Sequence, residues 1–231
     1  MTEPQQLLLD LPLRAALGRD DFMVTPSNAA AVRLVDEWPR WPSHGAILHG
    51  PEGAGKSHLA QVWRMRSNAT IIAARELEVA GVAAVFQAQA ICIEDLQAGK
   101  FDERALFHAL NLAHQSQGHV LLTTRSDLAS LHIALPDLAS RLKALPMVGI
   151  LAPDDALLRG VLVKLFADRQ IQVDEATVSY ILLRMPRSLA AARHLVAEVD
   201  RLAMTEKAEV SRAFVAKVMA RIVSPDFFTT P

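Results

Sequence analysis

Residues Gly50 to Ser57 read Gly-Pro-Glu-Gly-Ala-Gly-Lys-Ser and satisfy the pattern G-x-x-x-x-G-K-[ST] at every fixed position. Glycines let the backbone curl tightly, so that successive N–H groups and the start of the next helix surround an anion. Lys56 would reach the β- and γ-phosphates of a nucleotide, and the Ser57 hydroxyl would bind Mg²⁺. The pattern therefore predicts a site for a nucleoside triphosphate and Mg²⁺.

The residues on either side of this loop fit the same interpretation. Residues 46–49 have the character of a short buried strand, and residues 58–63 have that of a helix. A chance match in a glycine-containing turn is the alternative, and the strand–loop–helix order argues against it.

Two carboxylates, Glu94 and Asp95, follow the apolar run 90–93, which we expect to be a strand. A nucleotide-hydrolysing site needs one acid to hold Mg²⁺ through water and another to polarise the attacking water. Glu94 and Asp95 are the candidates, although a solvated acidic strand end would look the same. Thr123 and Thr124 end the next expected strand and are weaker candidates for a γ-phosphate contact, since threonine is common in strands.

Two arginines lie where a guanidinium could reach a phosphate. Arg141 lies in Leu-Pro-Asp-Leu-Ala-Ser-Arg-Leu and Arg187 in Met-Pro-Arg-Ser, and we expect each to follow a turn beyond the core elements. A guanidinium in such a position can contact a phosphate of its own chain or of a partner. An ordinary surface arginine is the alternative, and the spacing alone favours it.

The apolar pattern divides the chain into parts. The expected strands are 46–49, 70–73, 90–93, 119–123 and 147–151, and the expected helices between them are 25–38 with Thr25 as N-cap, 82–87, and one from Asp102 to about Gln115. This alternation predicts a five-stranded parallel sheet with ligands at the carboxyl ends of the strands. After Pro153 only helical stripes follow, at 157–166, 189–202 and 214–222. We expect a tail over residues 1–17, an α/β core over 18–152 and a helical lid over 153–231.

The amino-acid composition argues against several classes of protein, namely nucleic-acid-wrapping, disulfide-rich and membrane proteins. Lys and Arg number 24 against 25 Asp and Glu in 231 residues, so the chain as a whole has no charge for wrapping nucleic acid. Cys92 is the one cysteine, which leaves no disulfide framework and suits a reducing cytoplasm. The N-terminus lacks an export signal and no run of about 18 apolar residues occurs, so we expect a cytoplasmic protein with no membrane partner.

Together these motifs resemble the AAA+ family, and within it the DnaA-related regulators of replication initiation known as Hda. The resemblance covers nearly the whole chain and includes a leading peptide at residues 6–11 and the segment 22–28. It implies the AAA+ P-loop fold with a small all-α lid. The nucleotide contacts expected from the loop and the resemblance are Asn28, Gly50, Pro51, Gly53, Gly55, Lys56, Ser57, His58, Thr124 and Arg187.

The resemblance also implies partners. The residues that resemble a sliding-clamp-binding peptide are Gln6, Leu7, Leu9 and Leu11. Arg141 matches the arginine offered in trans to ATP bound by DnaA, and Arg187 matches the lid arginine that senses the nucleotide. The implied protein holds ADP or ATP, binds the clamp of the replicative polymerase, contacts DNA only through the clamp, and makes DnaA hydrolyse its ATP.

Two positions depart from the family pattern. Asp10 stands where the clamp peptide commonly has proline, and Glu94 stands where the first acid is usually aspartate. The longer side chain of Glu94 leads us to expect at most weak intrinsic hydrolysis. The chain ends at the lid, so we also expect no helix-turn-helix domain, which argues against an initiator. The sequence leaves open the resting nucleotide, a homodimer, and the role of Phe227-Phe228.

Two other functions compete with this one. The intact loop and the acidic pair also suit a self-sufficient AAA+ ATPase, such as a loader or remodeller. A small P-loop kinase would need an acceptor site and a mobile basic lid, and the sequence offers a signal for neither.

Overall fold

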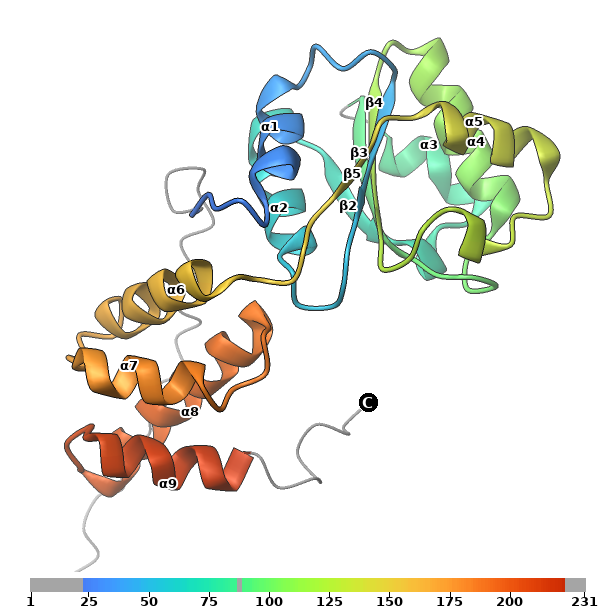
Figure 1. The fold of residues 1–231 in the computed structure, drawn as a ribbon. Helices are drawn as coiled ribbons and strands as arrows, with labels where there is room; N and C mark the ends of the chain where they lie inside the picture. The colour runs from blue at the N-terminus through green and yellow to red at the C-terminus, as the bar shows by residue number, and fades with distance from the viewer. Residues whose placement is uncertain (1–22, 87–88, 223–231) are drawn as a thin grey trace, which may run out of the picture.

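The computed structural model describes residues 23–86 and 89–222, and within them a five-stranded parallel sheet has the order β2-β3-β4-β1-β5. The strands are β1 (Gly45–His49), β2 (Thr70–Ala73), β3 (Ala90–Leu96), β4 (His119–Thr124) and β5 (Met147–Gly149). Figure 1 shows the strands running so that the loop between β1 and α2 lies at the end of the sheet that faces α6. The predicted α/β fold with a five-stranded parallel sheet is confirmed.

Helices cover both faces of the sheet and then form a bundle. The helices of the core are α1 (Ala29–Glu37), α2 (Lys56–Ser67), α3 (Val82–Val85), α4 (Glu103–Gln115) and α5 (Pro136–Ala144), with 3₁₀ turns η2 (Ala74–Glu76), η3 (Val79–Gly81) and η4 (Ala129–Leu131). The helices that follow are α6 (Asp155–Ala167), α7 (Glu175–Leu182), α8 (Leu189–Glu206) and α9 (Arg212–Ile222). Figure 1 shows α1 and α2 on one face of the sheet and α3, α4 and α5 on the other.

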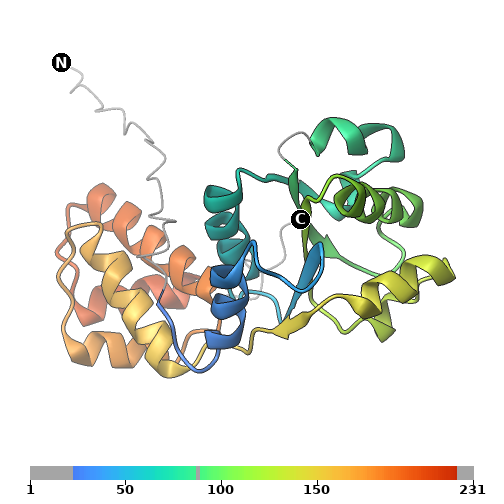
Figure 2. The same cartoon turned by 90° about the horizontal axis from the view of Figure 1, so that it is seen from above.

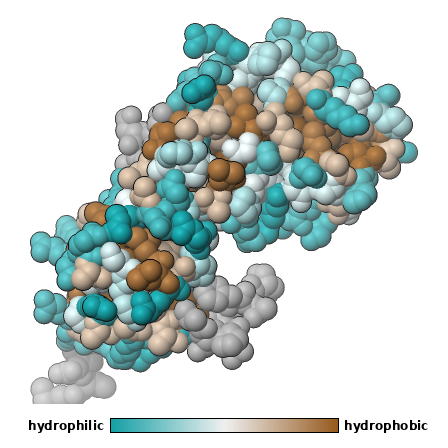
Figure 3. All heavy atoms as spheres, in the orientation of Figure 1, coloured by the Kyte–Doolittle hydropathy of each residue, from teal (hydrophilic) through white to brown (hydrophobic). Residues whose placement is uncertain are grey.

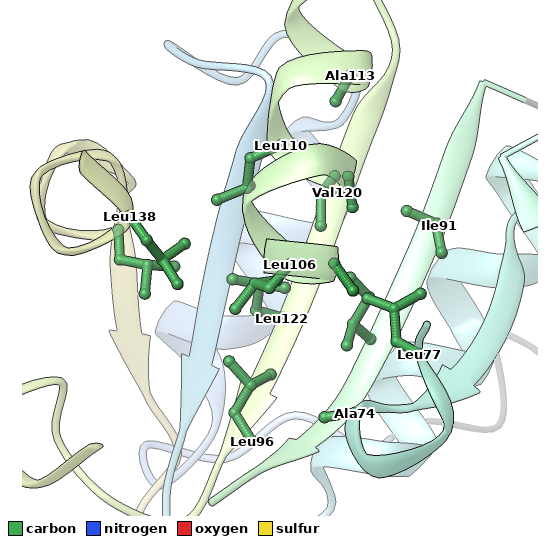
Figure 4. Packing of buried hydrophobic residues seen from close by; sticks show 14 of the residues in the cluster. Ala74, Leu77, Ile91, Leu96, Leu106, Leu110, Ala113, Val120, Leu122 and Leu138 are labelled. Atoms are coloured by element: carbon green, nitrogen blue, oxygen red, sulfur yellow. The ribbon is translucent and has the colours of Figure 1, made fainter. Parts of the chain in front are cut away.

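Strict alternation along the central strands builds a core on each face of the sheet, because successive strand side chains point to opposite sides. In β1, Leu48 packs toward α1 and α2, whereas Ile47 packs toward α4 and α5. In β4, Leu121 lies on the first side and Leu122 on the second. Figure 4 shows the second cluster, where Leu106 of α4 lies over the middle of the sheet. The sheet is therefore rigid at the point where the phosphate loop leaves it.

A separate apolar cluster holds α6 to α9 together. Its fully buried members include Leu162 and Phe166 of α6, Ile181 of α7, and Val196 and Val199 of α8. In Figure 3 the helix bundle and the α/β core form two lobes, and Figure 2 shows α1 and the connection from β5 to α6 at their junction. None of the helices in residues 23–86 and 89–222 is long and apolar enough to cross a membrane.

Several expected boundaries shift for local reasons. The predicted N-cap at Thr25 is wrong: the Thr25 carbonyl accepts from the N–H groups of Asn28 and Ala29 in a turn, and α1 begins at Ala29. Asp102 caps α4 as predicted, with its carboxylate accepting from two backbone N–H groups of the first turn. The helix expected at 82–87 is shortened to the single turn α3, and helices α5 and α7 were not predicted.

Candidate nucleotide site

The predicted phosphate loop connects β1 to α2 and packs against the start of α8. Gly53 has φ of +73° and Gly55 has φ of +109°, a region that side-chain-bearing residues rarely occupy. A Cβ on Gly53 would lie 2.0 Å from the Ser188 Oγ at the start of α8. The Leu189 N–H donates to the Gly53 carbonyl at 3.0 Å. The loop is thus a tight turn that lies directly against the first turn of α8.

The start of α2 offers backbone donors to an anion. Its N-cap is Gly55, which makes no side-chain capping bond, and its first turn carries no acidic residue. The first N–H groups of a helix have no partner within the helix, and the positive end of the helix dipole lies there. Ser57 is exposed in this turn and His58 is half-buried. This arrangement fits a phosphate group.

The Lys56 side chain is buried and lies over its own loop. Its ammonium donates to the carbonyls of Gly50 at 2.6 Å and Pro51 at 2.8 Å. Burial lowers the pKa of Lys56, and the nearby Arg125 charge lowers it further. The carboxylates that oppose this lowering of the Lys56 pKa belong to Asp95, Glu52 and Glu94. A buried cation among these groups would gain from an incoming phosphate, which would lower the cost of its charged form.

The acidic pair lies in an irregularity of β3. The register shifts between Ile93 and Leu96, so that Glu94 and Asp95 together oppose Thr123 of β4. The Asp95 N–H donates to the Thr123 hydroxyl at 3.0 Å, and Asp95 has φ of +60°. β3 therefore extends to Leu96, one residue past the carboxylate pair that was predicted to end it. The bulge puts two consecutive carboxylates at the carboxyl end of the sheet, beside the loop.

The residues predicted to hold Mg²⁺ fit a partly hydrated ion. The Glu94 Oε1 is buried without a hydrogen-bond partner in the described part of the chain. Such an oxygen costs free energy unless a donor, such as a metal-bound water, reaches it. Within the same ranges no group of three or more His, Cys, Asp or Glu forms a metal cage. Mg²⁺ is commonly bound through one or two protein oxygens, waters and substrate phosphates, which Ser57 and Glu94 would satisfy.

Arg125, which the sequence reasoning missed, links the loop to the acidic pair. Its Nε donates to the Asp95 Oδ1 at 2.9 Å, and its Nη1 forms an ion pair with Glu52 of the loop. Gln97 donates to the other Asp95 oxygen at 2.6 Å. The signal available in the sequence was its place immediately after the paired threonines of β4. Both Asp95 oxygens therefore already accept hydrogen bonds, and the Arg125 charge makes this carboxylate a weaker base for polarising a water.

Two of the predicted nucleotide contacts make hydrogen bonds within the protein. The Thr124 hydroxyl donates to the Leu96 carbonyl at 3.1 Å and ties β4 to β3. The Asn28 amide accepts from the Thr25 N–H and donates to the Met23 carbonyl, both at 2.9 Å. Both side chains are buried. In this structure they shape the ends of β4 and of the segment before α1.

Arg187 lies beside the loop but points to the start of α6. Its guanidinium forms an ion pair with Asp155 at 2.8 Å and donates to the Pro153 carbonyl at 3.2 Å. The next residue, Ser188, caps α8 and lies against Gly53. Arg187 therefore lies in the helical part of the chain, next to the residue that packs against the loop.

Arg141 lies away from the loop, in the interior of α5. The expectation that it follows a turn is wrong, because Leu138 and Leu142 bury one face of a regular helix that carries it. Its guanidinium is 5.1 Å from the Phe107 ring centroid and its side chain is exposed. The residues predicted for the clamp, Gln6 to Leu11, and the Phe227-Phe228 pair lie outside the described residues.

Comparison with known proteins places the fold. No protein family profile and no curated protein sequence matches the chain. Domain III of the replication initiation protein DnaA of Thermotoga maritima has a similar structure, with a TM-score of 0.76, 18% identity, and coverage of 93% of this chain and 100% of that one. The Holliday junction branch migration motor RuvB of Thermotoga maritima is also similar, with a TM-score of 0.69, 18% identity, and coverage of 91% of this chain and 73% of that one. AMPPCP-bound DnaA of Aquifex aeolicus has a TM-score of 0.63 and 15% identity, and the match covers 81% of this chain and 64% of that one. At these identities the likeness is one of fold, the AAA+ P-loop fold.

Proposed function

We propose that this chain is a nucleotide-bound negative regulator of chromosomal replication initiation, of the Hda type. In this proposal it docks on the sliding clamp and stimulates hydrolysis of ATP held by DnaA. The observation that carries the proposal is the position of Arg141: an exposed guanidinium on α5, away from the chain's own loop, in a fold similar to DnaA domain III. Because Arg141 is too far from the chain's own nucleotide site to contact a phosphate there, its guanidinium is available to the nucleotide site of a partner.

The chain's own site would hold ADP or ATP. The Lys56 ammonium would exchange the Gly50 and Pro51 carbonyls for phosphate oxygens, while the first turn of α2 donates its N–H groups. Ser57, and Glu94 through water, would hold Mg²⁺, which neutralises charge between phosphate oxygens when it is bound. Because α8 begins against the loop, the nucleotide would set the angle between core and lid.

The Arg141 guanidinium would act at the partner's ATP. Its planar group offers paired N–H donors to phosphate oxygens, and such an arginine raises phosphoryl-transfer rates by about 10³–10⁵. Contact with the Phe107 ring holds the group at the surface of α4 and α5. The peptide with Gln6, Leu7, Leu9 and Leu11 would bind the clamp, so that DNA is contacted only indirectly.

The test measures hydrolysis of labelled ATP bound to DnaA, with clamp loaded on DNA. We expect the wild-type chain to accelerate hydrolysis and Arg141→Ala to lose most of the acceleration. Lys143→Ala is the matched control, because it removes another exposed cation from the same helix. Equal acceleration by Arg141→Ala and the wild type would exclude the trans role. A chain lacking residues 1–17 should fail to bind the clamp in a pull-down.

A self-sufficient ATPase is the second candidate. Lys56, Glu94 and Asp95 meet beside one loop, as such an enzyme requires. The pairing of Asp95 with Arg125 and Gln97 argues for slow turnover. ATP hydrolysis by the purified chain alone, abolished by Lys56→Ala, would support this function; none at any protein concentration would exclude it.

A further inference from the structure

A second hollow opens at the end of the core away from the phosphate loop. Its volume is about 590 Å³, and it lies between α4, α5 and the segment before β1. His119 is the first residue of β4 and His44 immediately precedes β1, so the hollow is at the amino ends of the strands. The polar and aromatic residues that line it are Trp41, His44, His114, Gln117, His119 and Arg141. This size is in the range of small-molecule sites.

The histidines of the hollow form one cluster. The ring centroids of His44 and His114 are 5.2 Å apart, and those of His44 and His119 are 5.9 Å apart. His119 lies edge-on to Trp38 and Trp41, with centroids 5.8 Å away in both cases. These rings come from α4, β4 and the segments before β1, so the cluster is a feature of the folded core.

The charge of the hollow has one sign. Among the described residues that line it, none is Asp or Glu. Arg141 brings a guanidinium to the hollow and takes part in none of the ion pairs between described residues. The His44 Nδ1 donates to the Gly118 carbonyl at 3.0 Å, which leaves its Nε2 for another group. Potential cations thus gather here without a counter-charge.

We propose that this hollow binds a small organic anion with at least two negative charges, such as a phosphate monoester or a polycarboxylate. Arg141 would supply a forked donor and His114 an imidazole N–H to the anionic end, and the His44 Nε2 would donate to it when the ring carries both protons. The apolar wall formed by Leu110 and Leu145 would contact the organic part. This site is separate from the phosphate loop. It shares Arg141 with the proposed function but does not rest on that function, and His114→Gln tests the hollow apart from Arg141.

The proposal carries a pH dependence. Burial lowers the pKa of His119, and the proximity of His44 lowers it further. The ionisable groups that face His119 across the hollow are His44, His114 and Arg141, all of which are cationic when charged. A bound polyanion would favour the charged form of His119 and so oppose this lowering of its pKa, which means that binding takes up a proton there and strengthens as the pH falls.

The chain offers an intrinsic probe of this hollow. Of its three tryptophans, Trp63 contacts both Trp38 and Trp41, and the latter two contact His119. Tryptophan fluorescence would therefore be followed during titration with inorganic phosphate, glucose 6-phosphate and citrate at pH 6 and pH 8, with chloride at matched ionic strength. We expect saturable binding of glucose 6-phosphate or citrate, severalfold tighter at pH 6 than at pH 8.

Variants assign the binding to the hollow. His114→Gln and Arg141→Gln alter exposed side chains, so the fold should persist, and each should weaken binding by about tenfold or more. Lys143→Gln is the matched control on α5 and should bind like the wild type. Lys56→Ala should also bind like the wild type, which separates this site from the nucleotide site. Binding lost in Lys56→Ala but kept in His114→Gln and Arg141→Gln would overturn the proposal, as would no saturable signal at pH 6.

Discussion

Replacement of Gly53 by alanine tests the contact between the phosphate loop and the lid. Gly53 and Gly99 have nearly the same backbone conformation, with φ of +73° and +68°. A Cβ at Gly99 meets nothing within 4 Å, whereas one at Gly53 would lie 2.0 Å from the Ser188 Oγ and 2.8 Å from its Cβ. Gly99→Ala is therefore a matched control, because it carries the backbone strain without the steric clash.

The structure sets the size of the expected effect. A left-handed residue with a side chain costs about 1–2 kcal/mol, and this cost applies to both variants. Overpacking against Ser188 adds about 1–3 kcal/mol for Gly53→Ala alone. In a chain of this size the added cost should lower the Tm by roughly a further 2–12 °C. Thermal unfolding followed by circular dichroism measures both variants.

A double substitution localises the added cost. Ser188→Gly removes both close atoms and leaves the Ser188 Cα at 3.4 Å from the new Cβ. Glycine replaces serine as an N-cap at a cost of only a few tenths of a kcal/mol. Gly53→Ala combined with Ser188→Gly should therefore recover most of the difference from Gly99→Ala. If Gly53→Ala and Gly99→Ala have the same Tm, the first turn of α8 does not lie against the loop.

Two further predictions concern the charged groups of the site and the lid. Arg125→Met removes a charge that lowers the pKa of Lys56, so the Lys56 pKa should rise, as NMR titration of labelled lysines can measure; an unchanged value would contradict the pairing geometry. The backbone N–H of Leu157 lowers the pKa of Asp154 below 3.8, so its stabilising effect on α6 is present above that pH and lost as the pH falls through the lowered value. The Tm difference between the wild type and Asp154→Asn should therefore vanish in strong acid, and a difference independent of pH would refute this.

Local sequence patterns were sufficient to predict the strands of the sheet and the presence of the phosphate loop. The alternation in β1 and β4 and the glycine spacing of 50–57 are properties of short segments, and they determine both strand placement and backbone shape. The bulge at Glu94 and Asp95 could not be predicted, because it depends on the Thr123 hydroxyl of a neighbouring strand.

Contacts between distant parts of the chain also could not be predicted from the sequence. Arg125 pairs with an acid of the loop and another of β3, so its role exists only in the folded sheet. Helix α7 has only eight residues, and an apolar run of that length cannot be told from a strand by its period alone. Arg141 was singled out by its segment and by resemblance, but its place in a helix beside a histidine-lined hollow required the tertiary structure.

Calorimetric titration of the purified chain with ADP and Mg²⁺ would show whether the loop at residues 50–57 holds a nucleotide. We expect one site per chain, with affinity reduced at least about tenfold by Lys56→Ala, because the buried ammonium is lost from the phosphates. Equal binding by Lys56→Ala, or no binding by the nucleotide-stripped wild type, would contradict it.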